Sequence, residues 1–227
     1  MTFPLMLFAA GLGTRMGDLV KDRPKPLVPV AGKPLIDHAL AFADLPQIGA
    51  KVVNLHYHAP LLRDHLAGQD ILFSDETDLL RETGGGLRHA MPLLGTSPVI
   101  TMNTDAVWRG RNPIAHLIAN WREEMEALLL IIDQPHAAGH KGAGDFGRDA
   151  SGRLHRGAGT VKDKIYTGVQ IIRTDLLGGI AQDAFSLNLI WDKMQESGGL
   201  YGTVYDGQWC DVGQPSSIPL AEAMLHV

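Results

Sequence analysis

The chain has 227 residues, of which 45% are hydrophobic, and it carries 20 Lys and Arg against 25 Asp and Glu. This composition excludes wholesale disorder, and the length favours a single α/β domain. A formal net charge of −5 leaves no cationic surplus, and no cluster of Lys and Arg predicts a nucleic-acid-binding surface. The single cysteine, Cys210, excludes an internal disulfide and a thiolate metal cluster. We therefore expect a cytoplasmic protein, because a reducing compartment suits a chain without disulfides.

The first ten residues, MTFPLMLFAA, are apolar and end in small residues, as a secretion signal does. No Lys or Arg precedes Arg15, so the positively charged segment that begins such a signal is missing. The run is also too short to span a bilayer. We interpret it as a buried first strand and predict no association with a membrane.

Apolar runs typical of strands alternate with helical patterns along the chain. The expected strands are residues 5–9, 52–55, 71–73, 99–102, 128–132, 167–172 and 200–205. The expected helices are residues 35–42, 61–66, 86–94, 114–126, 175–180 and 187–196, and one that begins at Ser216. The alternation predicts an α/β fold with a doubly wound, mostly parallel, Rossmann-like sheet and right-handed crossovers.

One long stretch interrupts this pattern. Residues 136–160 are rich in Gly, His and charge and lack apolar periodicity. We expect an inserted, mobile flap at roughly residues 134–162, a candidate lid, in a single domain that spans residues 1–227.

A glycine-rich turn follows the first expected strand, with the string AAGLGTRM at residues 9–16 and RPKPL at residues 23–27. Such a turn exposes backbone N–H groups that can cradle phosphates. A dinucleotide-binding fingerprint needs glycine where Met16 stands, and a P-loop needs a Gly-Lys-Ser/Thr run that is absent. Arg15 offers a planar fork for phosphate oxygens, and Lys25 offers a point charge between two stiffening prolines. The alternative is an ordinary tight turn with two surface cations.

Two aspartates follow apolar strands and are candidate metal ligands. Asp105 ends the string TMNTD, and Asp211 lies in WCDVG near the last expected strand. Ligands of open α/β sheets bind beyond the carboxyl ends of the strands. Two carboxylates together with triphosphate oxygens and water suit octahedral Mg²⁺. Either aspartate alone would be explained as a helix cap or turn residue, but beside a phosphate-binding loop the metal hypothesis is favoured.

These blocks resemble the signature of the sugar-1-phosphate nucleotidyltransferases. The resemblance begins with GLGTRM (11–16) and PKPL (24–27), and the remaining blocks follow in the family's order over nearly the whole chain: PVAGKPLI (29–36), VNLHY (53–57), ETGGG (82–86), NTD (103–105), GDF (144–146), TG (167–168) and WCDVG (209–213). It implies the nucleotide-diphospho-sugar transferase fold and Mg²⁺-dependent transfer from an NTP to a sugar 1-phosphate. The short uridylyltransferases of bacterial cell-wall recycling are the most similar members, which implies UTP and N-acetylmuramate 1-phosphate or a related hexosamine phosphate.

The resemblance also implies a role for individual residues. The residues that would bind the nucleotide are Gly11, Gly13, Thr14, Arg15, Lys25, Glu76, Thr77, Thr83, Gly84 and Asn103. Those that would contact the sugar are Asn103, Asp145, Thr167 and Gly168. Asp105 and Asp211 would hold Mg²⁺, and Arg15, Lys25 and Asp105 would be the catalytic residues. The expected assembly is a monomer or a weak homodimer.

Two departures from the family pattern bear on function. Thr104 stands where the family usually has glycine before the metal-binding aspartate, and the loop at residues 75–81 is one residue longer than in the uridylyltransferases. Transfer of a guanylyl group from GTP to mannose 1-phosphate therefore stays open, as does a non-catalytic, nucleotide-sensing regulatory homologue. A third hypothesis, a metal-dependent hydrolase, rests on the pair His56 and His58 and is disfavoured because the further ligands it needs are not evident.

Overall fold

A seven-stranded sheet forms the centre of the computed structural model, which describes residues 2–226. The strand order is β13-β8-β12-β6-β1-β4-β5, and β12 runs antiparallel to both of its neighbours while the other neighbouring pairs are parallel. The predicted mostly parallel sheet is therefore confirmed. The strands are β1 (Phe3–Phe8), β4 (Ile48–Leu55), β5 (Leu72–Asp75), β6 (Val99–Asn103), β8 (Ala127–Asp133), β12 (Lys164–Ile172) and β13 (Leu200–Val204).

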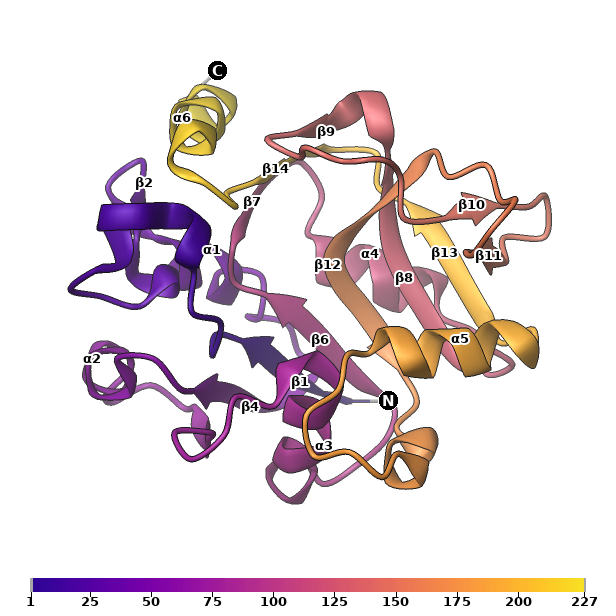
Figure 1. The fold of residues 1–227 in the computed structure, drawn as a ribbon, viewed down its shortest axis with the longest axis horizontal. Helices are drawn as coiled ribbons and strands as arrows, with labels where there is room; N and C mark the ends of the chain where they lie inside the picture. The colour runs from indigo at the N-terminus through magenta and orange to yellow at the C-terminus, as the bar shows by residue number, and fades with distance from the viewer. Residues whose placement is uncertain (1, 227) are drawn as a thin grey trace.

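Helices cover both faces of this sheet (Figure 1). Because side chains alternate along a strand, Leu5 and Leu7 of β1 pack in one apolar cluster, and Met6 packs in another. The first cluster includes residues of α1 (Leu35–Leu40), α2 (Ala59–His65) and α4 (Pro113–Asn120). The second includes residues of α3 (Glu82–Leu94) and α5 (Asn188–Glu196). The expected doubly wound arrangement is thus confirmed.

Some of the expected helices have different limits in the structure. The helix expected at residues 114–126 ends at Asn120, where Trp121 adopts an extended backbone, because the following residues turn so that the N–H of Glu126 donates to the Gly199 carbonyl. The helix expected to begin at Gly86 already begins at Glu82. The helix expected at residues 175–180 is a 3-10 turn, η4 (Asp175–Gly179). The C-terminal helix α6 (Ile218–His226) follows the short turn η5 (Pro215–Ser217).

A second, three-stranded sheet was not predicted from the sequence. It has the order β7-β14-β9, with β7 (Ala106–Arg109), β14 (Gln208–Asp211) and β9 (Ala137–Ala138). Strands this short leave no readable alternation, and their partners are distant in the chain. The antiparallel pairing of β14 with β7 places Asp211 opposite Ala106, the residue that follows Asp105. The pairing of β7 with β14 therefore brings both predicted metal ligands to one end of this small sheet.

The segment at residues 134–162, where we expected an inserted, mobile flap, contains short strands that the sequence did not predict. It contributes β9 and the hairpin of β10 (Gly147–Arg148) and β11 (Leu154–His155), and it starts with a 3-10 turn, η3 (Gln134–His136). Phe146 and Leu154 are both buried in the cluster that holds α5. The sequence pattern missed this because single apolar residues, separated by glycines, anchor the segment.

The ETGGG block forms the first turn of α3, and its glycines allow another segment to lie against it. The N–H groups of Gly84 and Gly85 both donate to the carbonyl of Phe185, at 2.8 and 3.0 Å. A Cβ atom on Gly85 would clash with the Asp183 carbonyl oxygen. Arg88 of the same helix donates to two further carbonyls of this segment, those of Ile180 and Gln182. The glycines therefore join α3 to the chain that leads into α5.

We expect Gly85→Ala to lower the free energy of unfolding by about 1–3 kcal/mol, the usual cost of overpacking a tight backbone contact. Urea or thermal unfolding followed by circular dichroism measures the change. Gly178→Ala is the matched control, because a Cβ there would meet nothing within 4 Å. We expect the control to stay within about 0.5 kcal/mol of the parent chain. Equal stability of the two variants would contradict the close contact.

Candidate active site

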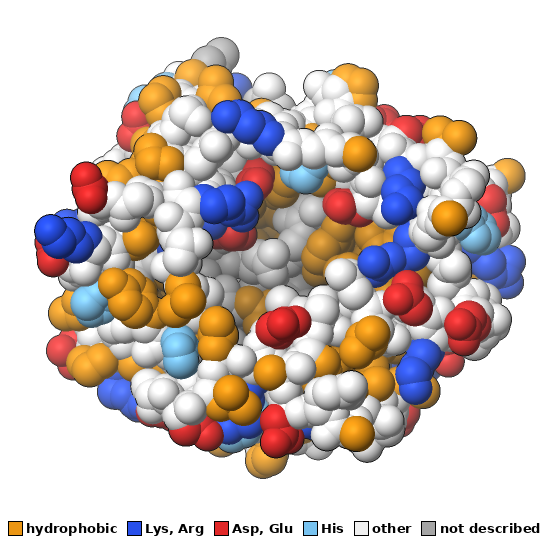
Figure 2. All heavy atoms as spheres, in the orientation of Figure 1, with side chains coloured by type: hydrophobic (Ala, Val, Ile, Leu, Met, Phe, Trp, Pro, Cys, Tyr) orange, Lys and Arg blue, Asp and Glu red, His pale blue; other side chains and the backbone are white. Residues whose placement is uncertain are grey.

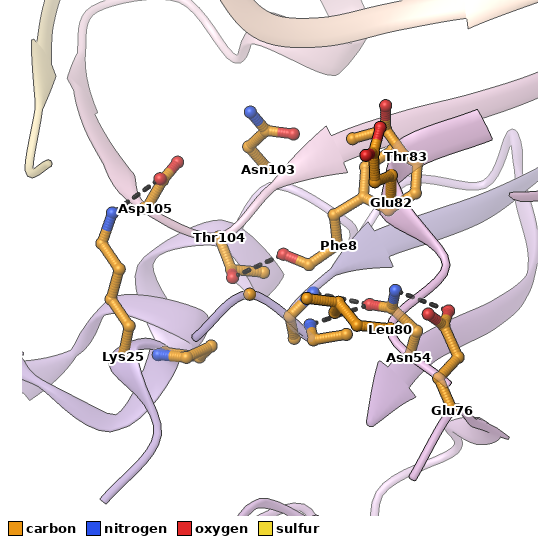
Figure 3. A pocket seen from close by; sticks show the side chains of 14 residues that line it. Phe8, Lys25, Asn54, Glu76, Leu80, Glu82, Thr83, Asn103, Thr104 and Asp105 are labelled. Atoms are coloured by element: carbon orange, nitrogen blue, oxygen red, sulfur yellow. Dashed lines mark hydrogen bonds and ion pairs between the residues drawn. The ribbon is translucent and has the colours of Figure 1, made fainter. Parts of the chain in front are cut away.

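A cavity of about 260 Å³ opens where β1, β4 and β6 end, and Figure 2 shows this face of the molecule hollowed at its centre. Its position agrees with the rule that open α/β sheets bind ligands beyond the carboxyl ends of their strands. The lining residues are Phe8, Ala9, Ala10, Gly11, Lys25, Pro26, Asn54, Glu76, Leu80, Glu82, Thr83, Asn103, Thr104 and Asp105 (Figure 3).

The loop that leaves β1 lines one side of this cavity and carries backbone donors left unpaired by the described part of the chain. The N–H groups of Gly11, Leu12 and Gly13 have no hydrogen-bond partner among residues 2–226. Gly13 has a φ of 64°, and a Cβ atom there would lie 2.8 Å from the Cβ of Lys25. Glycine is required at this position both by the left-handed backbone and by the close approach of Lys25. The loop then continues into the 3-10 turn η1 (Thr14–Val20), which begins with Thr14 and the exposed Arg15.

Lys25 is largely buried at the edge of the cavity and faces Asp105. Its Nζ lies 2.7 Å from Oδ2 of Asp105, with side-chain exposures of 10% for the lysine and 34% for the aspartate (Figure 3). Lys25 begins the short turn η2 (Lys25–Leu27), and Pro24 before it has an extended backbone. The two flanking prolines restrict the backbone, so that positioning the ammonium group costs less conformational entropy. The expected cation is therefore at the cavity.

Asp211 lies beside Asp105, as the sequence predicted. The N–H of Val212 donates to the Asp105 carbonyl at 2.9 Å, at the end of the β7–β14 pair. Burial raises the pKa of Asp211, and the nearby negative charge of Asp105 raises it further; Lys25, Arg15 and His140 act in the opposite direction. A Cβ atom on Gly213 would lie 3.1 Å from Asp211 Oδ2 and 3.3 Å from Arg15 Nη1, which places Arg15 beside Asp211.

These contacts bring two carboxylates and two cations to one place. Asp105 and Asp211 are the residues that could hold a divalent cation here, because two partly buried carboxylates side by side are a hard, anionic donor set. Among residues 2–226 no group of three His, Cys, Asp or Glu side chains has the arrangement of a metal site.

His140, which lies in the expected flap, was not among the residues predicted for the site. The side chain is half-buried, its Nε2 atom is buried without a partner in the described chain, and its charge bears on the pKa of Asp211. The preceding Gly139, with a φ of 73°, passes so closely over the Asp211 carbonyl that a Cβ atom would not fit. A Gly-His pair in a glycine-rich segment gives no signal of this position.

The residues expected to contact the sugar lie around the middle of β12 and beside it. Gly168 has a φ of 87° and packs against Asn103, since a Cβ atom on it would lie 2.9 Å from the Cβ of Asn103. Oδ2 of Asp145 accepts a hydrogen bond of 2.9 Å from the N–H of Tyr166. The Thr167 hydroxyl is buried and donates to the Leu130 carbonyl at 2.7 Å, so that side chain is already engaged within the fold. Asn103 belongs both to this group and to the cavity lining.

The residues expected to border the base are less uniform in position. Glu76 and Thr83 line the cavity, and the Thr83 hydroxyl accepts a hydrogen bond of 3.0 Å from the N–H of Leu187. Gly84 instead supports the segment above α3, as described. Thr77 is exposed, is not among the lining residues, and donates from its hydroxyl to Asp75 Oδ1 at 2.6 Å.

Thr104, which departs from the family pattern, directs its hydroxyl to the backbone. It is buried and donates to the Phe8 carbonyl at 2.8 Å, tying β6 to β1 at the floor of the cavity (Figure 3). The two histidines of the alternative hydrolase motif contact different carbonyls. His56 Nδ1 lies 2.6 Å from the Glu76 carbonyl, and His58 Nε2 lies 3.2 Å from the Lys21 carbonyl.

Comparison with known proteins places this geometry in a family. The model of the MobA-like NTP transferase domain matches residues 5–158. The chain belongs to this family. It is 36% identical over 231 residues to the N-acetylmuramate alpha-1-phosphate uridylyltransferase of Caulobacter vibrioides, covering 97% of this chain and 96% of the relative. It is 31% identical to the protein of that name from Neisseria meningitidis serogroup B, covering 96% of each.

A solved structure supports the same fold. HddC from Yersinia pseudotuberculosis, crystallised with GMP-PN, superimposes with a TM-score of 0.76 at 20% identity, covering 99% of this chain and all of the other. The resemblance inferred from the sequence blocks is therefore confirmed, and the chain is a nucleotidyltransferase. Across residues 2–226, none of the helices combines the length and apolar character that a membrane crossing needs.

Cys210, between Trp209 and Asp211, allows a chemical test of this region. The thiol is fully buried, and burial together with the Asp211 charge raises its pKa from 9.0 to about 11. At neutral pH this shift leaves about 100-fold less thiolate, since each pKa unit is a factor of ten. We expect native protein to react with Ellman's reagent at least about 100-fold more slowly than protein unfolded in guanidinium. Equal rates in the two states would contradict the burial of the thiol.

Proposed function

We propose that the chain transfers a nucleotidyl group from an NTP, with UTP as the preferred donor, to a sugar 1-phosphate, with N-acetylmuramate α-1-phosphate as the preferred acceptor. The products are a nucleoside-diphosphate sugar and pyrophosphate, and such a reaction fits cell-wall recycling. The observation that carries this proposal is the meeting of Lys25 and Arg15 with Asp105 and Asp211 beside a loop of free backbone donors. The relatives named above support the choice of UTP and N-acetylmuramate.

The chemistry requires charge neutralisation more than acid–base catalysis. The attacking phosphate oxygen of the sugar 1-phosphate is already an anion, so no general base is needed. The barrier comes from repulsion between two polyanions and from the alignment of attacking oxygen, α-phosphorus and leaving pyrophosphate. Lys25, Arg15 and the N–H groups of Gly11 and Gly13 would hold the triphosphate and stabilise its developing charge.

Mg²⁺ is the proposed cofactor. Asp105 and Asp211 would hold the ion, because these two partly buried carboxylates are brought together at the end of the β7–β14 pair. Once bound, it supplies positive charge to the phosphate oxygens of the triphosphate.

The substrate contacts proposed for the remaining residues follow the two halves of the site. Thr83 would border the base, and Thr14 would complete the triphosphate contacts. Thr77, which lies outside the cavity lining, and Gly84, which supports the segment above α3, are not proposed to contact the base. Glu76 lines the cavity, but its carboxylate is bonded to Asn54 and to the N–H of Arg81. Asn103, Asp145, Thr167 and Gly168 would surround the sugar. The retention of Arg15, Lys25, Asp105 and Asp211 in one cluster favours a catalyst over a regulatory homologue that only senses nucleotides.

We expect Lys25→Ala and Asp105→Asn each to lower turnover by about 100-fold or more, the usual effect of losing one preorganised charged group. Pyrophosphate release under saturating substrates measures the loss, and circular dichroism checks that each variant is folded. Lys33→Ala, an exposed lysine in the hairpin of β2 (Pro29–Val30) and β3 (Lys33–Pro34), is the control and should keep parental turnover. Normal turnover in folded Asp105→Asn would remove the metal assignment.

A screen of the four common NTPs against a panel of sugar 1-phosphates, with Mg²⁺, tests the substrates. We expect pyrophosphate release to be fastest with UTP and N-acetylmuramate α-1-phosphate, to stop with EDTA and to return with excess Mg²⁺. Preference for GTP with mannose 1-phosphate would establish the guanylyltransferase alternative instead. Release from no pair would contradict the proposed activity and favour the regulatory homologue.

A further inference from the structure

The loop that leaves β1 is anchored by one buried side chain from the neighbouring strand. Asn54, near the end of β4, is 3% exposed, and its Oδ1 accepts hydrogen bonds from the N–H groups of Ala9 at 2.7 Å and Ala10 at 3.2 Å (Figure 3). These are the last backbone donors of the loop that are bound within the protein. The donors that follow, from Gly11 to Gly13, are the free ones. Asn54 thus marks the point at which the chain changes from internal pairing to ligand binding.

The orientation of the Asn54 amide is determined by Glu76. Its Nδ2 donates to Oε1 of Glu76 at 2.8 Å, and Oε2 of Glu76 accepts from the N–H of Arg81 at 3.3 Å. An ionised carboxylate can only accept hydrogen bonds, so the NH₂ group of Asn54 must face it and the carbonyl oxygen must face the loop. Without this partner, the amide could rotate and present its NH₂ group to two backbone donors.

Burial and two hydrogen bonds to its carboxylate hold the Glu76 side chain in one orientation. It is fully buried, and its own N–H donates to the Leu55 carbonyl at 2.8 Å. A Cβ atom on Gly86 would lie 2.8 Å from Oε1 of Glu76 and 3.3 Å from Nδ2 of Asn54, so the third glycine of the ETGGG block leaves the space in which the two side chains meet. A buried carboxylate pays a large desolvation cost, and burial raises its pKa accordingly. Because of this cost, stabilisation of the fold does not explain why a carboxylate is buried at residue 76.

We propose that Glu76 and Asn54 are a positioning pair that holds the β1 loop in the conformation that binds the triphosphate. Glu76 acts through Asn54, and its effect falls on phosphate binding rather than on the choice of base. This inference rests on the proposed function, because it assigns the free N–H groups of the loop to phosphate. It predicts that any pair of side chains that re-forms the same hydrogen bonds will restore nucleotide binding.

Exchanging donor and acceptor within the pair tests the proposal. In Asn54→Asp, two carboxyl groups face each other without a donor, and we expect the KM for every NTP that is turned over to rise at least about tenfold, with a smaller change in kcat. In the double variant Asn54→Asp with Glu76→Gln, the introduced amide can donate to the introduced carboxylate and still accept from Arg81. We expect its KM to return to within about threefold of the parental value and the ratios of kcat/KM among the NTPs to stay unchanged.

Ser74→Ala is the matched control. Ser74 lies opposite Asn54 in the β4–β5 pairing and is buried, and its hydroxyl has no partner within the described residues. We expect its removal to leave the KM for NTPs unchanged. Melting temperatures of all variants separate a loss of stability from a loss of positioning, because a purely structural pair would change the melting temperature without changing KM.

The double variant keeps the proposal testable even if Asn54→Asp does not fold. Parental KM and parental NTP ratios in the double variant support the positioning pair. Recovery of its melting temperature without recovery of KM would overturn the proposal. Altered NTP ratios would also overturn it and would indicate that Glu76 contacts the base directly. Equilibrium dialysis of UTP with MgCl₂ applies the same comparison to binding alone, so failure of the parent enzyme to release pyrophosphate would count against the proposed function and not against the pair.

Discussion

The meeting of Asp105 and Asp211 is the constraint on which the rest of the site depends. Two carboxylates held together in a partly buried place repel each other: burial raises the pKa of Asp211, and the charge of Asp105 raises it further. The fold tolerates this because Lys25 contacts Asp105 directly and Arg15 lies beside Asp211. The proposed cation and triphosphate would relieve this repulsion, and their binding would concentrate charge neutralisation at one point.

The small sheet explains how distant parts of the chain reach this point. Asp105 follows β6 of the main sheet, whereas Asp211 ends β14 of the three-stranded sheet, and the pairing of β14 with β7 joins them. The same sheet takes in β9, and with it the segment that brings His140 near Asp211. Substitutions in this small sheet would therefore alter the positions of Asp105 and Asp211 more than the packing of the main core.

Glycines in the site allow backbone to approach backbone or side chain. Gly13 lets Lys25 lie against the loop, Gly168 lets β12 lie against Asn103, and Gly86 makes room for Glu76. Each forms part of a block by which the sequence resembles its family. In these blocks, glycine therefore stands where a close contact or a left-handed backbone requires it, and a few charged side chains lie among these glycines.

Much of the molecule was predictable from the sequence alone because the signals are local. Apolar runs located the seven strands of the main sheet. The glycine-rich turn with Arg15 and Lys25, the two aspartates and the family blocks indicated a nucleotidyltransferase. Tertiary structure alone decided which strands pair, including the reversed direction of β12 and the pairing of β7 with β14. It decided where α4 ends and how the segment at residues 134–162 packs against the core. It also decided that His140 approaches Asp211 and that Asn54 holds the β1 loop. These features depend on contacts between residues far apart in the chain, which leave no periodic trace in the sequence.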